Sequence, residues 1–438
     1  MPILKTVTLG CKVNQYETEY LRQALRGVGY REAAGGEAAD LCLVNTCTVT
    51  AEGALKSRKA IRQLARENPQ AKIIVMGCYA TDAPDAVASL PGVVQVVRDK
   101  KELPHLLAQL GLPDAPTGIS SFGRRHRAYV KIQDGCRAGC AYCVIPRVRP
   151  RLWSRPAEEV VAEIRRLIDG GYSEVVLTGI HLGHYGLDSN ASAGQRQGRT
   201  LTELVHAILG LKGQFRVRLS SLEAAEVTPE LIQLMRDHPD RLCPHLHLPL
   251  QSGSDAVLKR MRRRWSSGQF VERCLAVRES LDEPALTTDV IVGFPGETAA
   301  DFEATCRVIQ EVGFSKVHCF RFSPRRGTPA ATMPNQVPGR VKRRRAAELI
   351  RLGQGQRREY CERLVGRRLQ VLAESVDPDH PENLLGTAGR YVPVRLAGTA
   401  TWLGRLLWVR AEGLGGHCIE ATPADSNGAG KGTTPRQR

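Results

Sequence analysis

The sequence has no apolar run that approaches the length of a membrane span, and its first residues lack the apolar stretch of a secretion signal, so we expect a cytoplasmic protein with no membrane partner. Aromatic residues make up only 5% of the chain, which leaves little surface for stacking unpaired nucleobases. Acidic residues are also scarce, 45 Asp+Glu against 62 Lys+Arg, and the net charge of +17 favours a polyanionic partner. Hydrophobic residues reach 42%, and 438 residues predict two or three domains with packed cores.

Cysteine, in contrast, is plentiful, with 13 residues. In a reducing compartment, cysteine indicates metal binding, catalysis or a core position. Cys136, Cys140 and Cys143 follow an apolar strand at 128–132. Three thiolates at this spacing can ligate three irons of an iron–sulfur cube and leave the fourth iron to a small chelating molecule. The alternatives are a zinc site or a disulfide loop, but structural zinc sites use four ligands, usually as paired Cys-x2-Cys units, and only the second half of this motif fits.

Three apolar runs in the N-terminal region each end in a cysteine, and helical patterns at 18–28 and 54–68 lie between them. This alternation predicts a βαβαβ unit with a parallel sheet, in which the carboxyl ends of the strands share one edge. The cysteines would then meet at that edge. The alternative is three unrelated core cysteines, but their position at three of three strand ends favours a second cluster site. The runs are 6–11, 41–47 and 73–78, and they end at Cys11, Cys47 and Cys78.

These motifs resemble those of the methylthiotransferases of the radical S-adenosylmethionine (SAM) superfamily. Cys-x3-Cys-x-aromatic-Cys, with Tyr142 in the aromatic slot, is similar to the radical SAM motif, and the strings at 9–17, 45–49 and 76–80 resemble the N-terminal cysteine motifs of these enzymes. The resemblance covers about residues 3–420. It implies two [4Fe-4S] clusters: Cys11, Cys47 and Cys78 would hold an auxiliary cluster whose open iron carries the sulfur to be transferred. The cluster that cleaves SAM would be held by Cys136, Cys140 and Cys143.

In the central region, six strand-like runs alternate with helical patterns, which suits a partial (βα)6 barrel with its site at the carboxyl ends of the strands. The resemblance implies the same fold. The polar string 188–199 has the composition of a mobile insert. The expected strands are 128–133, 174–180, 216–220, 245–250, 286–292 and 316–322, and the expected helices are 156–169, 201–211, 229–237, 255–281 and 299–312.

Strings at 177–186, 247–254 and 289–298 also resemble the family, and they follow or end expected strands. Their glycines permit close approach of backbone to a cofactor, and their polar side chains can donate or accept hydrogen bonds. The histidines at 181, 184, 245 and 247 lack the spacing of a metal-binding helix, and structural hydrogen bonds are expected for the last two. The candidate SAM-binding residues are Tyr142, Gly179, Gln251, Ser252 and Asp289.

The C-terminal region opens with a heavily basic helical pattern at 339–368. Strand-like runs follow at 368–375, 391–396 and 406–411, and they resemble the five-stranded TRAM barrel, which binds RNA. The tail is rich in Gly, Ser, Thr and Pro and is expected to be disordered. The fold class is therefore α/β, with an N-terminal parallel-sheet domain (1–115), a radical SAM domain (122–350), a basic helix with a TRAM-like β-barrel (351–424) and the tail (425–438).

The resemblance implies an enzyme that places a methylthio group on a tRNA base. One SAM would methylate the transferred sulfur and a second would supply the radical. The string 10–17 resembles the branch that acts at C2 of N6-threonylcarbamoyladenosine at tRNA position 37, with a low-potential electron donor and a sulfur source as further partners. The alternatives are the isopentenyladenosine branch, the branch that modifies a ribosomal-protein aspartate, a non-catalytic iron–sulfur RNA-binding protein and a zinc-stabilised RNA-binding module. Gly139, in place of an aromatic residue, and Arg149-Pro150, in place of Arg-Gly, depart from the family pattern.

Overall fold

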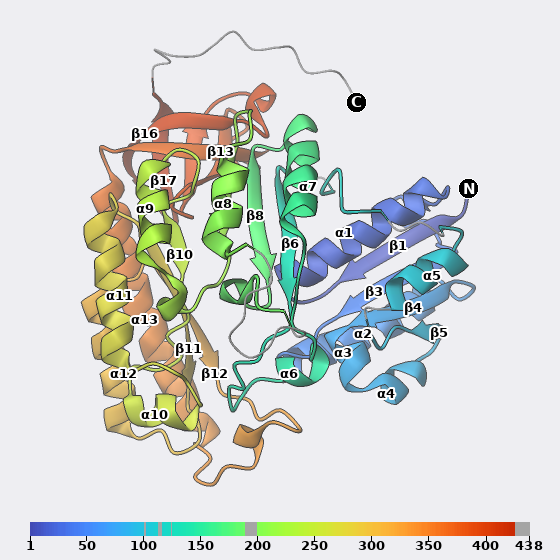
Figure 1. Ribbon diagram of the computed structural model, residues 1–438, viewed down its shortest axis with the longest axis horizontal. Coiled ribbons are helices and arrows are strands. Elements are labelled where there is room, and N and C mark those ends of the chain that lie inside the picture. The colour runs from blue at the N-terminus through green and yellow to red at the C-terminus, as the bar shows by residue number, and fades with distance from the viewer. Residues whose placement is uncertain (100–101, 113–115, 124, 189–198, 425–438) are drawn as a thin grey trace.

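The computed structural model places the chain in three parts, an N-terminal sheet, a central open barrel and a C-terminal closed barrel (Figure 1). None of the helices in the described part is both long and apolar enough to cross a bilayer. The expected tail and the interior of the expected insert at 188–199 lie outside the described residues, and the domain boundaries stay predictions. The structure describes residues 1–99, 102–112, 116–123, 125–188 and 199–424.

The N-terminal part contains a five-stranded parallel sheet in the order β2-β1-β3-β4-β5, which confirms the predicted fold of this region. The central strand β3 (Leu41–Thr46) is buried along its whole length because helices cover both faces of the sheet. The remaining elements are β1 (Ile3–Thr8), α1 (Lys12–Gly27), β2 (Arg31–Glu32), α2 (Ala51–Glu67), β4 (Lys72–Gly77), α3 (Cys78–Asp82), α4 (Pro84–Ala88), β5 (Val93–Val96) and α5 (Leu103–Gln109).

Helix α1 begins at Lys12, six residues before the helical pattern expected at 18–28. The early start escaped the sequence because part of the buried surface of the first turns is polar. Asn14 is 1% exposed and Glu17 is 4% exposed, since both bind a buried arginine of the central part. The apolar periodicity that marks a helix is therefore interrupted over these turns.

The central part is a six-stranded parallel barrel that stays open on one side, as predicted. Two sheets, β7-β6-β8-β9 and β10-β11-β12, are joined by single bridges such as Val217 to Leu242 and Ser221 to His247. No pairing among the described residues joins β12 back to β6. The elements are β6 (Arg127–Asp134), α6 (Ile145–Val148), β7 (Trp153–Ser154), α7 (Ala157–Asp169), β8 (Glu174–Gly179), α8 (Leu201–Leu209), β9 (Arg216–Leu219), α9 (Pro229–Asp237), β10 (His245–His247), β11 (Ala285–Val292), α12 (Ala299–Val312) and β12 (Lys316–Arg321).

The single helix expected at 255–281 is wrong, because the structure has two helices there, α10 (Asp255–Arg260) and α11 (Ser267–Ser280). Arg262 adopts a left-handed φ of +60°, which stops the first helix. Ser266 then caps the second helix in a capping box with Gln269. The break therefore depends on one backbone angle and one cap, which hydrophobic periodicity does not register.

The C-terminal part is a closed five-stranded barrel in the order β13-β14-β15-β17-β16, which confirms the predicted β-rich domain. The long helix α13 (Gly339–Leu364) runs beside β12 and leads into the closed barrel (Figure 1). The likeness of the closed barrel to TRAM modules stays a prediction. The strands are β13 (Arg368–Val376), β14 (Asn383–Ala388), β15 (Pro393–Ala397), β16 (Leu406–Gly415) and β17 (Cys418–Pro423).

Two buried arginines of β9 attach this barrel to the central part. Arg216 and Arg218 both donate to the fully buried carboxylate of Glu174. Their remaining N–H groups donate to backbone carbonyl oxygens of the closed barrel, including those of Gln370 and Gly389, at 2.7 and 2.8 Å. A charge that is both paired and hydrogen-bonded can be buried at an interface, so this network fixes the position of the C-terminal barrel.

Candidate functional site

The three N-terminal cysteines lie at the carboxyl ends of neighbouring strands. Cys11 follows β1, Cys47 follows β3, and Cys78 begins α3 directly after β4. Gly10 has a φ of +101°, and a Cβ atom added to it would lie 3.0 Å from Cβ and 3.1 Å from Sγ of Cys47. Glycine therefore allows the Cys47 thiol to lie this close to the backbone that precedes Cys11. Burial raises the pKa of the Cys47 thiol, and the charges of Cys78 and Cys11 shift it in the same direction.

The second triad lies in the loop between β6 and α6. Cys140 is buried, while Cys136 and Cys143 are partly exposed. Burial raises the pKa of the Cys143 thiol to about 12, and the charges of Cys140 and Cys136 add to the shift. Arg263 donates from Nη1 to Sγ of Cys140 at 3.3 Å. This guanidinium would stabilise a thiolate at that position.

Both triads fit the iron–sulfur clusters that the sequence predicts. All six thiols are free, and each triad is gathered in one place, the first at the carboxyl ends of β1, β3 and β4 and the second in the loop after β6. Thiolate sulfur is the ligand that such clusters use. Because burial disfavours the thiolates of Cys47 and Cys143, binding of a cluster must supply the free energy that releases the protons of these two thiols.

Arg149 connects the N-terminal triad to the central part. Its guanidinium is buried, and Nε donates to Sγ of Cys78 at 3.4 Å while Nη2 donates to Oδ1 of Asn14 at 2.9 Å. Nη1 donates to Glu17 at 3.0 Å and to Asp134 at 2.8 Å. Although burial opposes the charge, Glu17 and Asp134 hold the pKa of Arg149 well above its usual value. The permanently charged Arg149 therefore joins α1, β6 and a triad cysteine.

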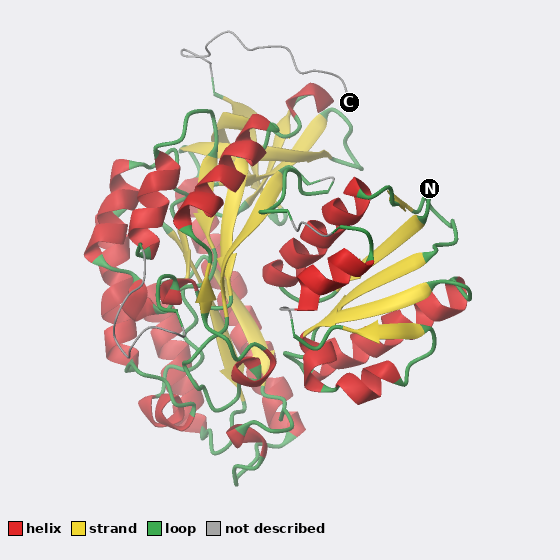
Figure 2. Cartoon of the chain, turned by 45° about the vertical axis from the view of Figure 1, so that its right-hand side comes forward, coloured by secondary structure: helices red, strands yellow, loops and turns green. Residues whose placement is uncertain are grey.

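The two triads belong to adjoining surfaces. Cys78 shares a small apolar cluster with Val144 and Val148, which lie just after the last cysteine of the second triad. The carboxyl ends of the N-terminal strands accordingly face the central part in Figure 2. Two cysteine sites that come from different domains thus border the same region of the molecule.

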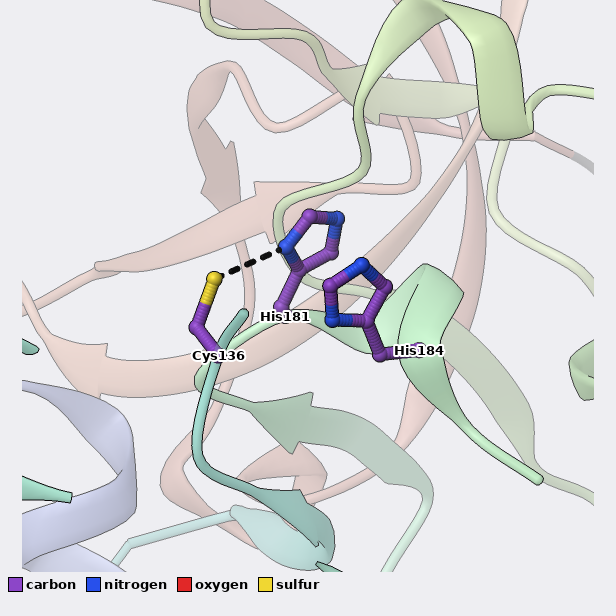
Figure 3. Close-up of side chains that lie close together, drawn as sticks. All are labelled: Cys136, His181 and His184. Atoms are coloured by element: carbon purple, nitrogen blue, oxygen red, sulfur yellow. Dashed lines mark hydrogen bonds between the residues drawn. The ribbon is translucent and has the colours of Figure 1, made fainter. Parts of the chain in front are cut away.

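Two histidines, His181 and His184, lie beside Cys136, as Figure 3 shows. Nδ1 of His181 lies 3.3 Å from Sγ of Cys136, and Nε2 of the same ring lies 2.5 Å from Oε1 of Glu226. Although burial opposes the charge, these hydrogen bonds raise the pKa of His181 to about 10. His184 stacks on His181 with ring centroids 3.7 Å apart and an angle of 13° between the planes. The lone pair of an imidazole nitrogen lies in the plane of its ring, and one metal ion cannot lie in the planes of two stacked rings at once. This geometry therefore suits orientation of Cys136 by His181 better than a shared metal ion.

Two of the predicted SAM-binding residues lie beside the second triad and at a strand end. Tyr142 packs against an apolar cluster that contains Phe294 and Phe322, and burial raises the pKa of its hydroxyl well above the usual value. Gly179 ends β8, and a Cβ atom added to it would lie 3.0 Å from Oε1 of Gln133. Both positions therefore restrict side-chain size around the loop, and their contact with SAM stays a prediction.

The other three predicted SAM-binding residues differ in whether their side chains already have partners within the protein. Gln251 has a φ of +65°, and its N–H donates to the carbonyl oxygen of Asp289 at 2.8 Å. Ser252 is buried, and its hydroxyl lies 3.3 Å from that of Thr305. Asp289 faces a cavity, with Oδ2 3.4 Å from Nε2 of His247. The Ser252 hydroxyl thus already has a partner within the protein, while the carboxylate of Asp289 is open to a ligand.

Sequence reasoning did not identify the side chains that support the cysteines. Arg149 was noted only as a departure from a motif, and Arg263 lies within a basic run, 262–264, that looks like a solvated surface. Arg325 donates to Oγ1 of Thr48 at 2.6 Å, next to Cys47. An arginine near a cysteine loop is too common in sequences to mark a site. Only the fold shows that these guanidinium groups lie beside the sulfur atoms.

Comparison with known proteins agrees with this arrangement. A model of the radical SAM superfamily matches residues 130–309, and a model described as uncharacterized protein family UPF0004 matches residues 4–99. The chain is 39% identical over 422 residues to threonylcarbamoyladenosine tRNA methylthiotransferase MtaB of Bacillus subtilis strain 168, covering 92% of each chain. It is 43% identical to the MtaB protein of Chlamydia pneumoniae over 85% of this chain and 87% of that one.

Relatives with another substrate in their name are also similar. The chain is 33% identical to the tRNA-2-methylthio-N(6)-dimethylallyladenosine synthase of Moorella thermoacetica, over 91% of this chain and 96% of that one. Among solved structures, the radical SAM methyltransferase TsrM of Kitasatospora setae, with cobalamin and a [4Fe-4S] cluster bound, has a TM-score of 0.56 and 14% identity, covering 75% of this chain and 77% of that one. That likeness supports the fold alone.

Proposed function

We propose, because this chain belongs to the methylthiotransferases of the radical SAM superfamily, that it replaces the hydrogen at C2 of N6-threonylcarbamoyladenosine at tRNA position 37 with a methylthio group. The relatives named for this substrate, at 34–43% identity, support the choice of base.

The observation that supports this proposal most strongly is that two cysteine triads from different domains lie on adjoining surfaces. Cys78 of the first triad contacts the residues that follow the second triad, and Arg149 binds Cys78 from the central part. An aromatic C–H bond needs a radical to be activated, and a methylthio group needs a source of sulfur. Two neighbouring thiolate sites bring these two requirements to one substrate.

When bound, the clusters and SAM would supply the radical and the methylated sulfur, with Cys136, Cys140 and Cys143 holding the cluster for SAM and Cys11, Cys47 and Cys78 the auxiliary cluster. The protein orients the sulfur atoms through buried charged donors, Arg149 at Cys78 and Arg263 at Cys140. His181 forms a hydrogen bond with Cys136 of the second triad. Since these donors are fixed by carboxylates behind them, the sites need little rearrangement to accept a cluster.

The tRNA would lie across the basic helix and the closed barrel. On α13, Arg340, Arg343, Arg344 and Arg351 are exposed, while Arg345 is buried and binds Glu297. Exposed arginines at this density attract the phosphate backbone, and their contribution depends on salt. The target base must leave the stack of its loop to reach the cysteine sites.

Two further partners belong to the proposal. Radical formation consumes an electron of low potential, and each methylthio group consumes one sulfur atom, so a reductant and a sulfur source must both reach the enzyme. Because the substrate is tRNA, we place the protein in the cytoplasm.

The test is the mass of the modified nucleoside. Anaerobically reconstituted enzyme is incubated with SAM, dithionite, sulfide and tRNA that carries threonylcarbamoyladenosine at position 37, and the digested nucleosides are analysed by mass spectrometry. We expect this nucleoside to gain one sulfur, one carbon and two hydrogens. Cys47→Ala should abolish the gain, while Cys42→Ala, a buried cysteine outside both triads, should retain it.

The same assay on tRNA that carries isopentenyladenosine separates the second candidate function, which the dimethylallyladenosine synthases among the relatives favour. A mass gain on isopentenyladenosine alone would overturn the proposal in favour of that branch. No gain on either tRNA, together with intact clusters, would favour a non-catalytic RNA-binding protein.

A further inference from the structure

A polar cavity of about 330 Å³ lies on the inner face of the open barrel and borders all three parts of the chain. Lys12 comes from the N-terminal α1, His245 and Lys316 come from β10 and β12, and Tyr391 comes from the loop between β14 and β15 of the closed barrel. We call it the lysine-lined cavity. Its volume suits a group of the size of an amino acid.

The two lysines of this cavity form no direct ion pair among the described residues, and the carboxylate of the lining, Asp289, affects Lys12 only through its charge at longer range. Neither the Lys12 nor the Lys316 ammonium forms a hydrogen bond or ion pair with any residue that the structure describes. Asp289, the carboxylate of the cavity, lies 3.4 Å from His247 instead. Burial lowers the pKa of Lys316, the shift expected for an ammonium that is removed from water without a partner. Arg218, which also lines the cavity, is paired with Glu174, so two lysines against the single carboxylate of Asp289 leave the lining with a net positive charge.

Two neutral polar atoms in the cavity also lack partners. Oγ of Ser220 and Nδ1 of His245 are buried without a hydrogen bond, on side chains that are 8% and 4% exposed. The other ring nitrogen of His245 lies 3.2 Å from Oγ1 of Thr287, and burial keeps the pKa of His245 well below its usual value, so the ring is neutral. Buried polar atoms in folded proteins almost always have a partner. Two unpartnered atoms beside two unpaired cations indicate the position of a polar, anionic ligand.

We propose that the lysine-lined cavity binds the threonyl carboxylate of N6-threonylcarbamoyladenosine, with Lys12 and Lys316 donating to its oxygens. This inference rests on the proposed function and deepens it by naming residues that select the substrate. The threonyl group also carries a hydroxyl, and its ureido linkage carries N–H groups and a carbonyl, which can satisfy Ser220 and His245.

The chemistry of the cavity discriminates between the two candidate bases. An isopentenyl group offers only carbon and hydrogen, so binding it here would leave both ammonium groups without an anion and both buried polar atoms without a partner. A site built to bind a polar group rejects an analogue without that group far more strongly than an apolar pocket rejects a size variant. The cavity thus favours the threonylcarbamoyl substrate over the isopentenyl one.

The place of the cavity agrees with this role. Lys12 directly follows Cys11 of the N-terminal triad, and the backbone of Asp289 accepts a hydrogen bond from Gln251, a predicted SAM-binding residue. A nucleobase whose side group is held by Lys12 therefore lies next to a cluster site. The cavity positions the substrate and takes no part in bond making.

The test measures binding rather than turnover. Reconstituted enzyme without reductant is titrated with fluorescent anticodon stem–loops that carry threonylcarbamoyladenosine, its methyl ester or unmodified adenosine at position 37. The ester keeps the shape and removes the charge. We expect wild type to bind the acid about 10- to 100-fold more tightly than the ester. Lys12→Gln and Lys316→Gln should each reduce this ratio towards one. Ser220→Ala removes a contact to a group that the acid and the ester share, so it should keep this ratio and weaken the binding of both relative to unmodified adenosine. Lys259→Gln, at an exposed lysine of α10, should preserve the ratio.

The outcomes separate this inference from the proposed function. If wild type forms the methylthiolated threonylcarbamoyl nucleoside but binds acid and ester equally, or if both lysine variants keep the wild-type ratio, the inference is overturned and the function stands. If methylthiolation occurs only on isopentenyladenosine, both are overturned. A lysine variant that loses its clusters or its thermal transition is replaced by Ser220→Ala, for which an unchanged preference for the acid over unmodified adenosine contradicts the inference.

Discussion

The guanidinium of Arg149 donates a hydrogen bond to the sulfur of Cys78, 3.4 Å away, and thereby links the central part of the chain to the N-terminal triad. The same side chain is held by Glu17 and Asp134, one from each of the two domains. A single buried charge therefore fixes both the domain interface and the environment of a cluster ligand.

Replacing Arg149 should weaken both features. Arg149→Gln removes a buried cation from the carboxylates of Glu17 and Asp134, which also bind Lys131, and we expect the free energy of unfolding to fall by about 3–5 kcal/mol. The iron held by the N-terminal triad should also be lost more readily. Chemical denaturation and iron content after gel filtration measure the two effects. Arg151→Gln, at an exposed arginine two residues away, is the control, and equal behaviour of the two variants would contradict this role.

Attachment of the C-terminal barrel should depend on pH through Glu174. Although burial opposes its charge, Arg216 and Arg218 hold the pKa of this carboxyl far below its usual range. Because the folded-state pKa is depressed, the stabilisation is present above the unfolded-state pKa of about 4.3 and is lost as the pH falls below it. We expect Glu174→Gln to lower the free energy of unfolding by about 3–5 kcal/mol near neutral pH and by less as the pH falls below 4.

Limited proteolysis between α13 and β13, combined with denaturation at several pH values, would follow this effect. Glu279→Gln, at an exposed carboxyl of α11, should match wild type throughout. A stability difference between wild type and Glu174→Gln that does not change with pH would show that Glu174 is not the titrating group.

His181 should control how firmly the second triad holds its iron. His181→Leu removes the hydrogen bond to Cys136 and leaves Glu226 without its imidazole partner. Loss of such a supporting contact costs about 10- to 100-fold in metal affinity. Transfer of iron to a chelator, followed by absorbance, should accelerate to that extent, and the electron paramagnetic resonance signal of the reduced cluster should change. His206→Leu, at an exposed histidine, should do neither, and an unchanged rate for His181→Leu would refute the assignment.

The exposed face of α13 should contribute to tRNA affinity by charge. Arg343→Gln with Arg344→Gln removes two exposed cations, and the slope of log affinity against log salt should fall by about one to two. Fluorescence anisotropy with full-length tRNA at several salt concentrations gives the slope. Arg62→Gln with Arg66→Gln removes the same charge from α2 and should have a smaller effect. Equal slopes for the two double variants would place the RNA elsewhere.

Much of the fold could be predicted because many strands of the N-terminal sheet and of the open barrel are apolar runs with a turn at their end. The parallel N-terminal sheet follows from three such runs, and the six strands of the open barrel were expected within a few residues of their observed limits. The meeting of Cys11, Cys47 and Cys78 needed only the rule that the carboxyl ends of parallel strands share an edge.

The features that escaped the sequence are polar and long-range. Asn14 and Glu17 hide the start of α1 because they bind Arg149, which lies more than 130 residues away in sequence. A left-handed backbone angle at Arg262 breaks a helical pattern that continues on both sides of it. Lys12 and Lys316 look like surface residues until the fold brings them from different parts of the chain to one cavity, so the lysine-lined cavity could not be inferred from charge alone.

The most direct measurement is the iron and sulfide content per chain after anaerobic reconstitution, for the parent protein and for the Cys136/Cys140/Cys143→Ala variant. Two cubane clusters predict about eight irons in the parent and about four in the variant, held by Cys11, Cys47 and Cys78. A variant that retains no iron, while its thermal transition matches that of the parent, would contradict the presence of a sulfur-carrying site at the N-terminal triad.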